Sequence, residues 1–211
     1  MSTIEAGALS RQFVVGVAGA PGAGKTSLAQ ALSQSLGART LDYDRYRPLT
    51  KLPVTDIRAW FARGGDPNEI DYSELVADLE RDTRLHVGAR SALVFETPFG
   101  RLHRASGAYI DFLVWIDAPL DLSLSRAMLA FTKAARARDE PAAGFLDWQA
   151  QYLANYPFLR EMYLVQSKRI APEADLTLDG AAPVEAWVAR IEAALRDHPG
   201  AAGIGRSSAS S

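Results

Sequence analysis

The sequence predicts an α/β fold in which a mostly parallel, five-stranded sheet carries helices on both faces. One observation behind this is that short apolar runs alternate with stretches of helical periodicity along most of the chain. Such alternation is typical of parallel sheets, because each helix connects one strand to the next. A second observation is the direct succession of a strand, a glycine-rich turn and a helix near the N-terminus. The five expected strands are residues 13–18, 39–41, 91–95, 110–116 and 176–178.

The glycine-rich turn matches the Walker A motif, G-x-x-x-x-G-K-[ST], at every fixed position. Its residues are Gly19, Ala20, Pro21, Gly22, Ala23, Gly24, Lys25, Thr26 and Ser27. In this motif, called the P-loop, backbone N–H groups and the positive end of the next helix surround a phosphate. Lys25 would contact the β and γ phosphates, and the Thr26 hydroxyl would hold Mg²⁺. We therefore expect a three-layer P-loop NTPase fold with ATP and Mg²⁺ as cofactors.

Helical patterns fill the intervals between the expected strands. After the P-loop, Leu28, Leu32 and Leu36 recur at helical spacing, and Gly37 is placed to cap the helix at its C-terminus. Asp71 is placed to cap a helix whose apolar face includes residues 72, 75, 76 and 79. Further helices are expected at about residues 120–131, 145–170 and 184–195.

A cluster of charged and aromatic side chains follows the second expected strand and contains Asp42, Asp44, Tyr46 and Arg47. The carboxyl ends of parallel strands line the ligand site of open α/β sheets, so we expect this cluster to contact a substrate. A solvated, charged turn that ends at Pro48 remains the alternative interpretation.

Two other acidic residues end apolar runs, Glu96 and Asp117. We expect Glu96 to hold Mg²⁺ together with Thr26, and we rank Asp117 lower because the residues after it read as the start of another helix. Arg101, shortly after Glu96, is a candidate for contact with an acidic or phosphorylated substrate, although a surface role is an equal alternative.

A basic, alanine-rich segment follows the helix that carries Arg126. We expect residues 132–144 to form a mobile helical lid, with Pro141 and Gly144 as hinges. In that lid, Arg126 and Arg136 would close over the phosphates and exclude water.

Composition limits the number of domains, the possible binding partners and the cellular compartment. The 211 residues, 48% of them hydrophobic, suit one domain, which we place at residues 12–198 between flexible ends at 1–11 and 199–211. A net charge of -2 argues against binding to nucleic acid or anionic membranes, and no apolar run is long enough for a membrane span. The absence of cysteine fits a reducing compartment, so we expect a cytoplasmic protein, with a homodimer left open.

Beyond the P-loop, these motifs resemble the uridine kinase group of P-loop kinases, whose relatives act on nicotinamide riboside, pantothenate and phosphoribulose. The resemblance spans about residues 12–180. It rests on Asp44 and Tyr46 after the second strand, and on further matches at residues 66–71, 93–97, 117–126 and 174–176. Thr97 stands where the group usually has glycine, and residues 66–71 lack the group's histidine.

The resemblance implies ATP-dependent transfer of the γ-phosphate to a hydroxyl of a small molecule, which could be nucleoside-like, a vitamin precursor or a sugar. Asp44 would orient and deprotonate that hydroxyl, and Tyr46, Arg47, Asp66, Glu96 and Arg101 would lie around the acceptor. A nucleoside monophosphate kinase is an alternative, but it needs a basic pocket where Asp66 and Asp71 are acidic. A guanine-nucleotide switch would need Asn-Lys-x-Asp, which the sequence lacks.

Overall fold

The structure is a computed structural model that describes residues 11–46, 54–84, 92–201 and 204. Its five strands form one sheet in the order β2-β3-β1-β4-β5, and every neighbouring pair is parallel. The predicted fold class is thus confirmed, with all five strands close to their expected positions. The strands are β1 (Phe13–Gly19), β2 (Arg39–Asp42), β3 (Ala92–Glu96), β4 (Phe112–Asp117) and β5 (Leu176–Asp179).

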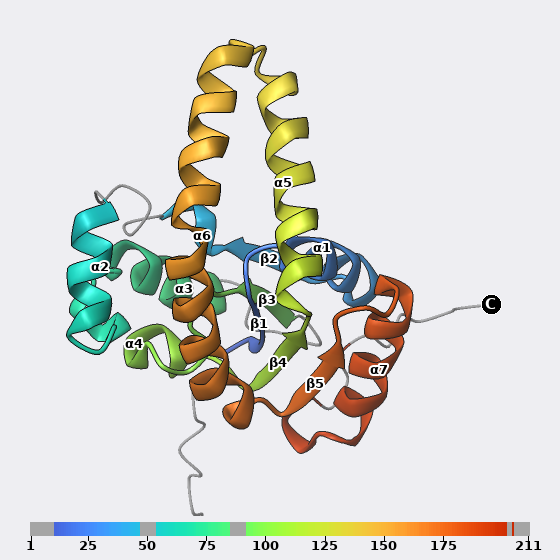
Figure 1. Cartoon of the computed structure of the whole chain (residues 1–211). Helices are drawn as coiled ribbons and strands as arrows, with labels where there is room; N and C mark the ends of the chain where they lie inside the picture. Colours follow the sequence, from blue (N-terminus) through green and yellow to red (C-terminus); the bar gives the residue numbers. More distant parts are fainter. Residues whose placement is uncertain (1–10, 47–53, 85–91, 202–203, 205–211) are drawn as a thin grey trace, which may run out of the picture.

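Helices cover both faces of the sheet (Figure 1). The apolar sides of α1 and α7 pack on one face, and those of α2, α3 and the C-terminal half of α6 pack on the other. Within the described residues, no helix is both long and apolar enough to cross a membrane. The helices are α1 (Lys25–Leu36), α2 (Val54–Ala62), α3 (Ser73–Arg84), α4 (Arg104–Gly107), α5 (Leu120–Ala137), α6 (Ala142–Ile170) and α7 (Val184–Asp197).

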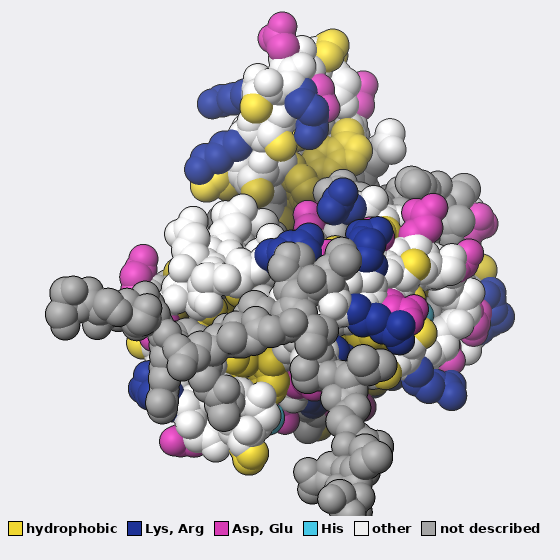
Figure 2. All heavy atoms as spheres, turned by 180° about the vertical axis from the view of Figure 1, so that it is seen from behind, with side chains coloured by type: hydrophobic (Ala, Val, Ile, Leu, Met, Phe, Trp, Pro, Cys, Tyr) yellow, Lys and Arg dark blue, Asp and Glu magenta, His cyan; other side chains and the backbone are white. Residues whose placement is uncertain are grey.

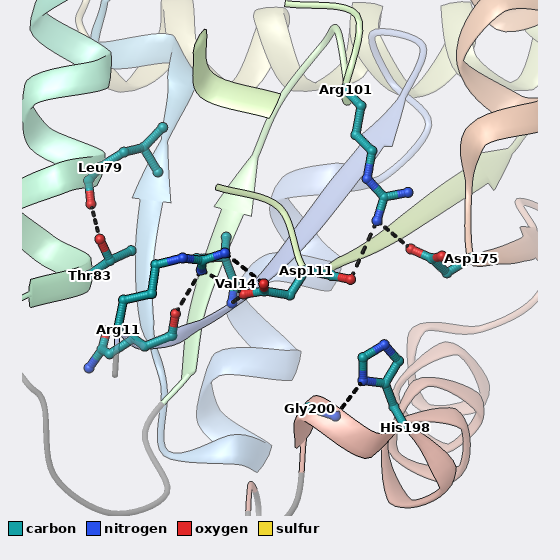
Figure 3. Close-up of polar contacts among 10 residues, drawn as sticks. Arg11, Val14, Leu79, Thr83, Arg101, Asp111, Asp175, His198 and Gly200 are labelled. Carbon is teal, nitrogen blue, oxygen red and sulfur yellow. Dashed lines mark hydrogen bonds and ion pairs between the residues drawn. The ribbon is translucent and has the colours of Figure 1, made fainter. Parts of the chain in front are cut away.

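Strand β4 begins two residues later than the apolar run suggested, because Asp111 precedes it and bonds to other residues through its side chain. Its carboxylate accepts the N–H of Val14 at 2.8 Å and forms a two-pronged ion pair with Arg11, both contacts at 2.7 Å (Figure 3). The side chain of Asp111 therefore takes the place of a strand neighbour at the amino edge of β1. This pairing aligns β1, the strand that leads into the P-loop.

The expected lid is part of a helical hairpin. Residues 132–137 continue α5, residues 142–144 open α6, and the turn between them places Asp139 in the left-handed region with a φ of 52°. We call α5 together with residues 142–156 of α6 the arm, because this pair of helices projects from the sheet (Figure 1). The segment expected to form the lid is therefore helical, as predicted. Gly144, which was expected to be a hinge, lies inside α6. The mobility of this segment stays a prediction.

Aromatic rings pack between the two helices of the arm. Phe131 of α5 meets Trp148 of α6 at a ring distance of 5.0 Å, and Tyr152 lies 5.8 Å from the same phenylalanine ring. The large hydrophobic side chains that are exposed in the described residues all lie on the arm: Leu129, Leu146, Trp148 and Leu153. Seen from behind, a hydrophobic surface lies on the arm near its junction with the body, above a group of charged side chains (Figure 2).

Candidate nucleotide and acceptor site

The P-loop connects the carboxyl end of β1 to α1 in a conformation that requires glycine. Gly22 and Gly24 have φ values of 82° and 107°, in the left-handed region. A Cβ atom on Gly22 would lie 1.9 Å from the carbonyl oxygen of Ser123 in α5. Because the loop packs directly against the base of the arm, any larger residue at this position would separate the two.

Lys25 occupies the position that the Walker A motif assigns to it. Its ammonium donates a hydrogen bond to the carbonyl oxygen of Ala20 at 3.2 Å, across the loop. Burial lowers the pKa of Lys25, whereas the nearby carboxylates of Glu96, Asp44 and Asp42 raise it, in that order of strength. The positive charge of Lys25 therefore lies among the carboxylates at the end of the sheet.

Thr26 and Glu96 lie together as the sequence predicted. The Thr26 hydroxyl donates to Oε1 of Glu96 at 3.1 Å. Glu96 is only 8% exposed, and this burial raises the pKa of its carboxyl, while Lys25 and the Thr26 hydroxyl lower it. The Glu96 carboxyl thus accepts a hydrogen bond from the Thr26 hydroxyl and lies near the charge of Lys25, while burial keeps its pKa above the usual value.

The donors at this site fit Mg²⁺. Hydroxyl and carboxylate oxygens are the hard ligands that this ion prefers. No group of three or more histidine or acidic side chains could hold a metal by itself within residues 11–46, 54–84 and 92–201. A site with one hydroxyl and one carboxylate matches the way Mg²⁺ binds with phosphates and water supplying its other ligands.

Asp44 lies beside this group, on a short turn of 3₁₀ helix (Tyr43–Arg45) that follows β2. Strand β2 ends at Asp42, which is in register with Glu96 on β3. The Asp42 carboxylate accepts the N–H of Asp44 at 2.7 Å. Asp42, Asp44 and Glu96 thus form one acidic group around Lys25.

The turn that carries Asp44 is anchored in the core by Tyr43. The Tyr43 hydroxyl is hydrogen-bonded to the hydroxyl of Tyr72, and both rings pack against Phe99. Burial is the main reason that the pKa values of both tyrosines are raised. Sequence patterns identified Tyr72 as a core residue of its helix, but no local signal links it to Tyr43.

The tyrosine pair leads to a prediction about stability. Tyr43→Phe or Tyr72→Phe should each lower the free energy of unfolding by about 1–2 kcal/mol, because the remaining hydroxyl is left buried without its partner. The double variant should cost less than the sum of the two, since no buried hydroxyl remains. Urea unfolding of the four proteins measures these differences. Strictly additive losses would contradict the hydrogen-bonded pair.

Two other residues predicted to contact the acceptor form hydrogen bonds within the protein. The hydroxyl of Tyr46 donates to the carboxylate of Asp78 on α3. Asp66 caps a short 3₁₀ helix (Pro67–Glu69) by accepting the N–H of Asn68 at 2.9 Å, and this hydrogen bond is the main reason that its pKa is lowered. Arg47 lies outside the described residues. Contact of any of the three with an acceptor stays a prediction.

Arg101 is not at the site, and its predicted role as an acceptor contact is corrected. Its guanidinium donates to the carbonyl oxygen of Glu173 and to the carboxylate of Asp175, both at 2.7 Å, and faces the carbonyl of Asp111 (Figure 3). Asp175 in turn accepts the N–H of Leu113 at 2.7 Å. These residues lie where β4 and β5 begin, so Arg101 joins the amino edge of the sheet, opposite the P-loop.

This correction can be tested. Arg101→Gln should lower the free energy of unfolding by about 1 kcal/mol, a modest value because the ion pair is partly screened by solvent. Activity per folded molecule should not change. Arg104→Gln is the matched control, because Arg104 is an exposed neighbour, and it should alter neither quantity. If Arg101→Gln is fully folded but loses activity, Arg101 does contact the acceptor.

The two arginines expected in the lid lie at different heights on α5. Arg126 donates to the carbonyl oxygen of Gly180 at 2.8 Å and so ties the base of the arm to the loop after β5. Arg136 is exposed near the far end of the helix. Their separation of ten positions corresponds to about 15 Å along a helix axis. Contact of Arg136 with a phosphate therefore requires that the arm bend toward the P-loop, which stays a prediction.

Comparisons with known proteins agree with the fold. No protein-family model matches the chain. A uridine kinase from Chloroflexus aurantiacus is 42% identical over 72 residues, which are 32% of this chain and 34% of that protein. A uridine kinase from Chloroflexus aggregans matches to the same extent. The match thus spans about a third of the length of these relatives.

Solved structures extend the agreement over most of the chain. A shikimate kinase from Bacteroides thetaiotaomicron has a TM-score of 0.55 at 16% identity and covers 87% of this chain and 98% of its own. A sugar kinase from Janibacter sp. HTCC2649 has a TM-score of 0.50 at 18% identity, with 90% and 98% covered. At these identities the likeness shows the shared P-loop kinase fold.

Proposed function

We propose that the protein is an ATP-dependent kinase that transfers the γ-phosphate to a hydroxyl of an uncharged small molecule. This proposal rests on one observation. The P-loop residues Lys25 and Thr26 lie in one group with Glu96, and Asp44 is close enough for its carboxylate to raise the pKa of the same lysine. A phosphate cradle with an additional carboxylate beside it is the arrangement that phosphoryl transfer to a hydroxyl needs.

Each residue of this group has a role in the proposed reaction. Lys25 and the P-loop N–H groups neutralise charge on the phosphates as the γ-phosphate leaves ADP. Thr26 and Glu96 would hold Mg²⁺, which would neutralise part of the negative charge on the phosphates. Asp44 orients the acceptor hydroxyl in line with the γ-phosphate and takes its proton as the new O–P bond forms.

The charges around Asp44 favour an uncharged acceptor. A nucleoside monophosphate kinase needs arginines that are available to bind the phosphate of its acceptor. Here the guanidinium of Arg63 pairs with Glu69 at 3.0 Å, and that of Arg81 pairs with Asp78 at 2.6 Å. These two arginines on the α2 and α3 side are therefore used within the protein. The match to uridine kinases supports a nucleoside or a similar polyhydroxylated compound.

A substrate screen tests the proposed function. Purified protein is incubated with ATP, Mg²⁺ and single compounds from a panel of nucleosides, sugars and vitamin precursors, and ADP release is measured. We expect at least one uncharged hydroxyl compound to stimulate ADP release well above the rate with water alone. Stimulation only by nucleoside monophosphates would favour the alternative kinase, and stimulation by no compound would contradict the proposal.

A further inference from the structure

Trp115 of β4 has a buried hydrogen-bond donor that the protein does not use. The residue is 4% exposed, and its indole Nε1 has no hydrogen-bond partner among the described residues. The two other buried tryptophans differ: Trp60 donates to the carbonyl of Asp66 at 2.9 Å, and Trp187 donates to the carbonyl of Asp179 at 2.7 Å. An unpaired buried donor is costly, and buried indoles usually find a partner. Trp115 therefore requires an explanation.

The position of Trp115 in the sheet places it beside the candidate site. It is in register with Ala18 on β1, the residue directly before the P-loop glycine Gly19. Neighbouring strands lie about 5 Å apart, so the backbone of Trp115 is one strand spacing from the start of the phosphate cradle. Ala18 and Trp115 also belong to the same hydrophobic cluster.

Trp115 also lies on the acceptor side of the sheet. Its side chain belongs to the hydrophobic cluster that includes Tyr43 and Tyr72, on the face covered by α3 and α6. The helix that follows the P-loop, α1, packs on the opposite face. Tyr43, the residue directly before Asp44, belongs to this cluster, so the turn that carries the proposed base begins on the same face as the indole.

We propose that the indole N–H of Trp115 binds an uncharged oxygen of the phosphate acceptor, a hydroxyl or a carbonyl. This inference rests on the proposed function and adds a specificity residue to it. The acceptor then has two points of attachment, the reacting hydroxyl at Asp44 and a second oxygen at Trp115. An anionic group is disfavoured next to Asp42 and Asp44 themselves, because like charges repel. The class of acceptor is thus a nucleoside or sugar with several oxygens.

The test follows the indole N–H resonances of wild-type protein by NMR after isotope labelling of tryptophan. Trp115→Phe assigns the Trp115 signal, and the signals of Trp60 and Trp187 serve as internal controls. The probes are uridine, uridine monophosphate, and the compound that stimulates ADP release most. We expect uridine or the stimulating compound to shift the Trp115 resonance and slow its hydrogen exchange, with little change at the controls.

The outcomes separate this inference from the proposed function. A compound that is phosphorylated without shifting the Trp115 resonance overturns the role of Trp115 and leaves the kinase intact. A compound that shifts the resonance but is not phosphorylated supports the binding role and counts against the kinase. A larger response to uridine monophosphate than to the uncharged probes, no response to any probe, or a bound water that stays on the indole throughout, would overturn the inference.

A kinetic measurement complements the spectra. Trp115→Phe keeps an aromatic ring in the core but removes the donor, so KM for the acceptor should rise by about three- to tenfold, the usual value of one neutral hydrogen bond. The Kd for ATP should stay unchanged. Equal increases in both constants would mean that the substitution disturbs the whole site, and an unchanged KM would mean that the N–H does not bind the acceptor.

Discussion

Lys25→Ala is expected to abolish measurable phosphoryl transfer and to weaken the binding of MgATP. The ammonium lies across the P-loop from the carbonyl of Ala20, where the phosphates of a nucleotide would attract it. Loss of one charged donor to the transferred phosphate typically lowers turnover by about 10²–10³-fold or more. Nucleotide-free protein should remain folded, because alanine is a good helix former at the first position of α1.

The measurement pairs ATP titration with steady-state turnover for wild type, Lys25→Ala and Lys168→Ala. Lys168 lies exposed in the C-terminal half of α6, so its substitution changes net charge equally but leaves the site alone. Lys168→Ala should behave like wild type in both assays. Equal ATP affinity and turnover in Lys25→Ala and wild type would contradict the assigned role of the P-loop.

Asp44→Asn is expected to slow transfer while leaving ATP affinity nearly unchanged. Asparagine keeps the size of the side chain but cannot take the proton of the acceptor hydroxyl. A positioned general base is worth about 10²–10⁴-fold in rate, and less if the carboxylate mainly orients the hydroxyl. The turn should keep its shape, because it is held by the backbone N–H of Asp44 on Asp42 and by the buried Tyr43 hydroxyl.

Asp42→Asn is the matched control for this experiment. Its amide oxygen can still accept the N–H of Asp44, so the turn is preserved and only one charge near Lys25 is lost. We expect a much smaller loss of turnover than for Asp44→Asn. If Asp42→Asn is the more damaging variant, the catalytic base is Asp42. If neither substitution changes turnover, the acceptor hydroxyl does not bind at the end of β2.

The features that sequence predicted well are those encoded by neighbouring residues. The strand before the P-loop, the glycines and the helix that starts at Lys25 form one continuous pattern, and Gly37 ends that helix in a left-handed conformation with a φ of 60°. The pairing of Thr26 with Glu96 could be expected because each stands at a defined position relative to a strand end. Parallel strands bring such positions to the same edge of a sheet.

The features that sequence missed depend on contacts between distant segments. Arg101 follows a strand end closely and looked like a ligand contact, but its partners Glu173 and Asp175 come from the segment before β5. Likewise, the hydroxyl pair that anchors Asp44 joins Tyr43 to Tyr72, and no local periodicity encodes this contact. The roles of these residues depend on burial and on polar contacts between segments that are distant in the sequence.

The arm is helical, as the sequence suggested, but its expected hinges are placed differently. Pro141 directly precedes the first residue of α6, where its missing N–H costs nothing, and Gly144 lies inside that helix. The alanine-rich residues before Pro141 extend α5, since alanine favours helix. Pro157 lies inside α6 without ending it, because packing of that helix on the sheet outweighs the lost hydrogen bond.

Phosphorus NMR of a reaction with MgATP and the best acceptor from the screen tests the central claim most directly. We predict that a phosphate ester of the acceptor appears as ADP accumulates, in equal amounts, and that neither forms with Lys25→Ala. Release of inorganic phosphate without an ester would show that water is the acceptor and that the protein is not a small-molecule kinase.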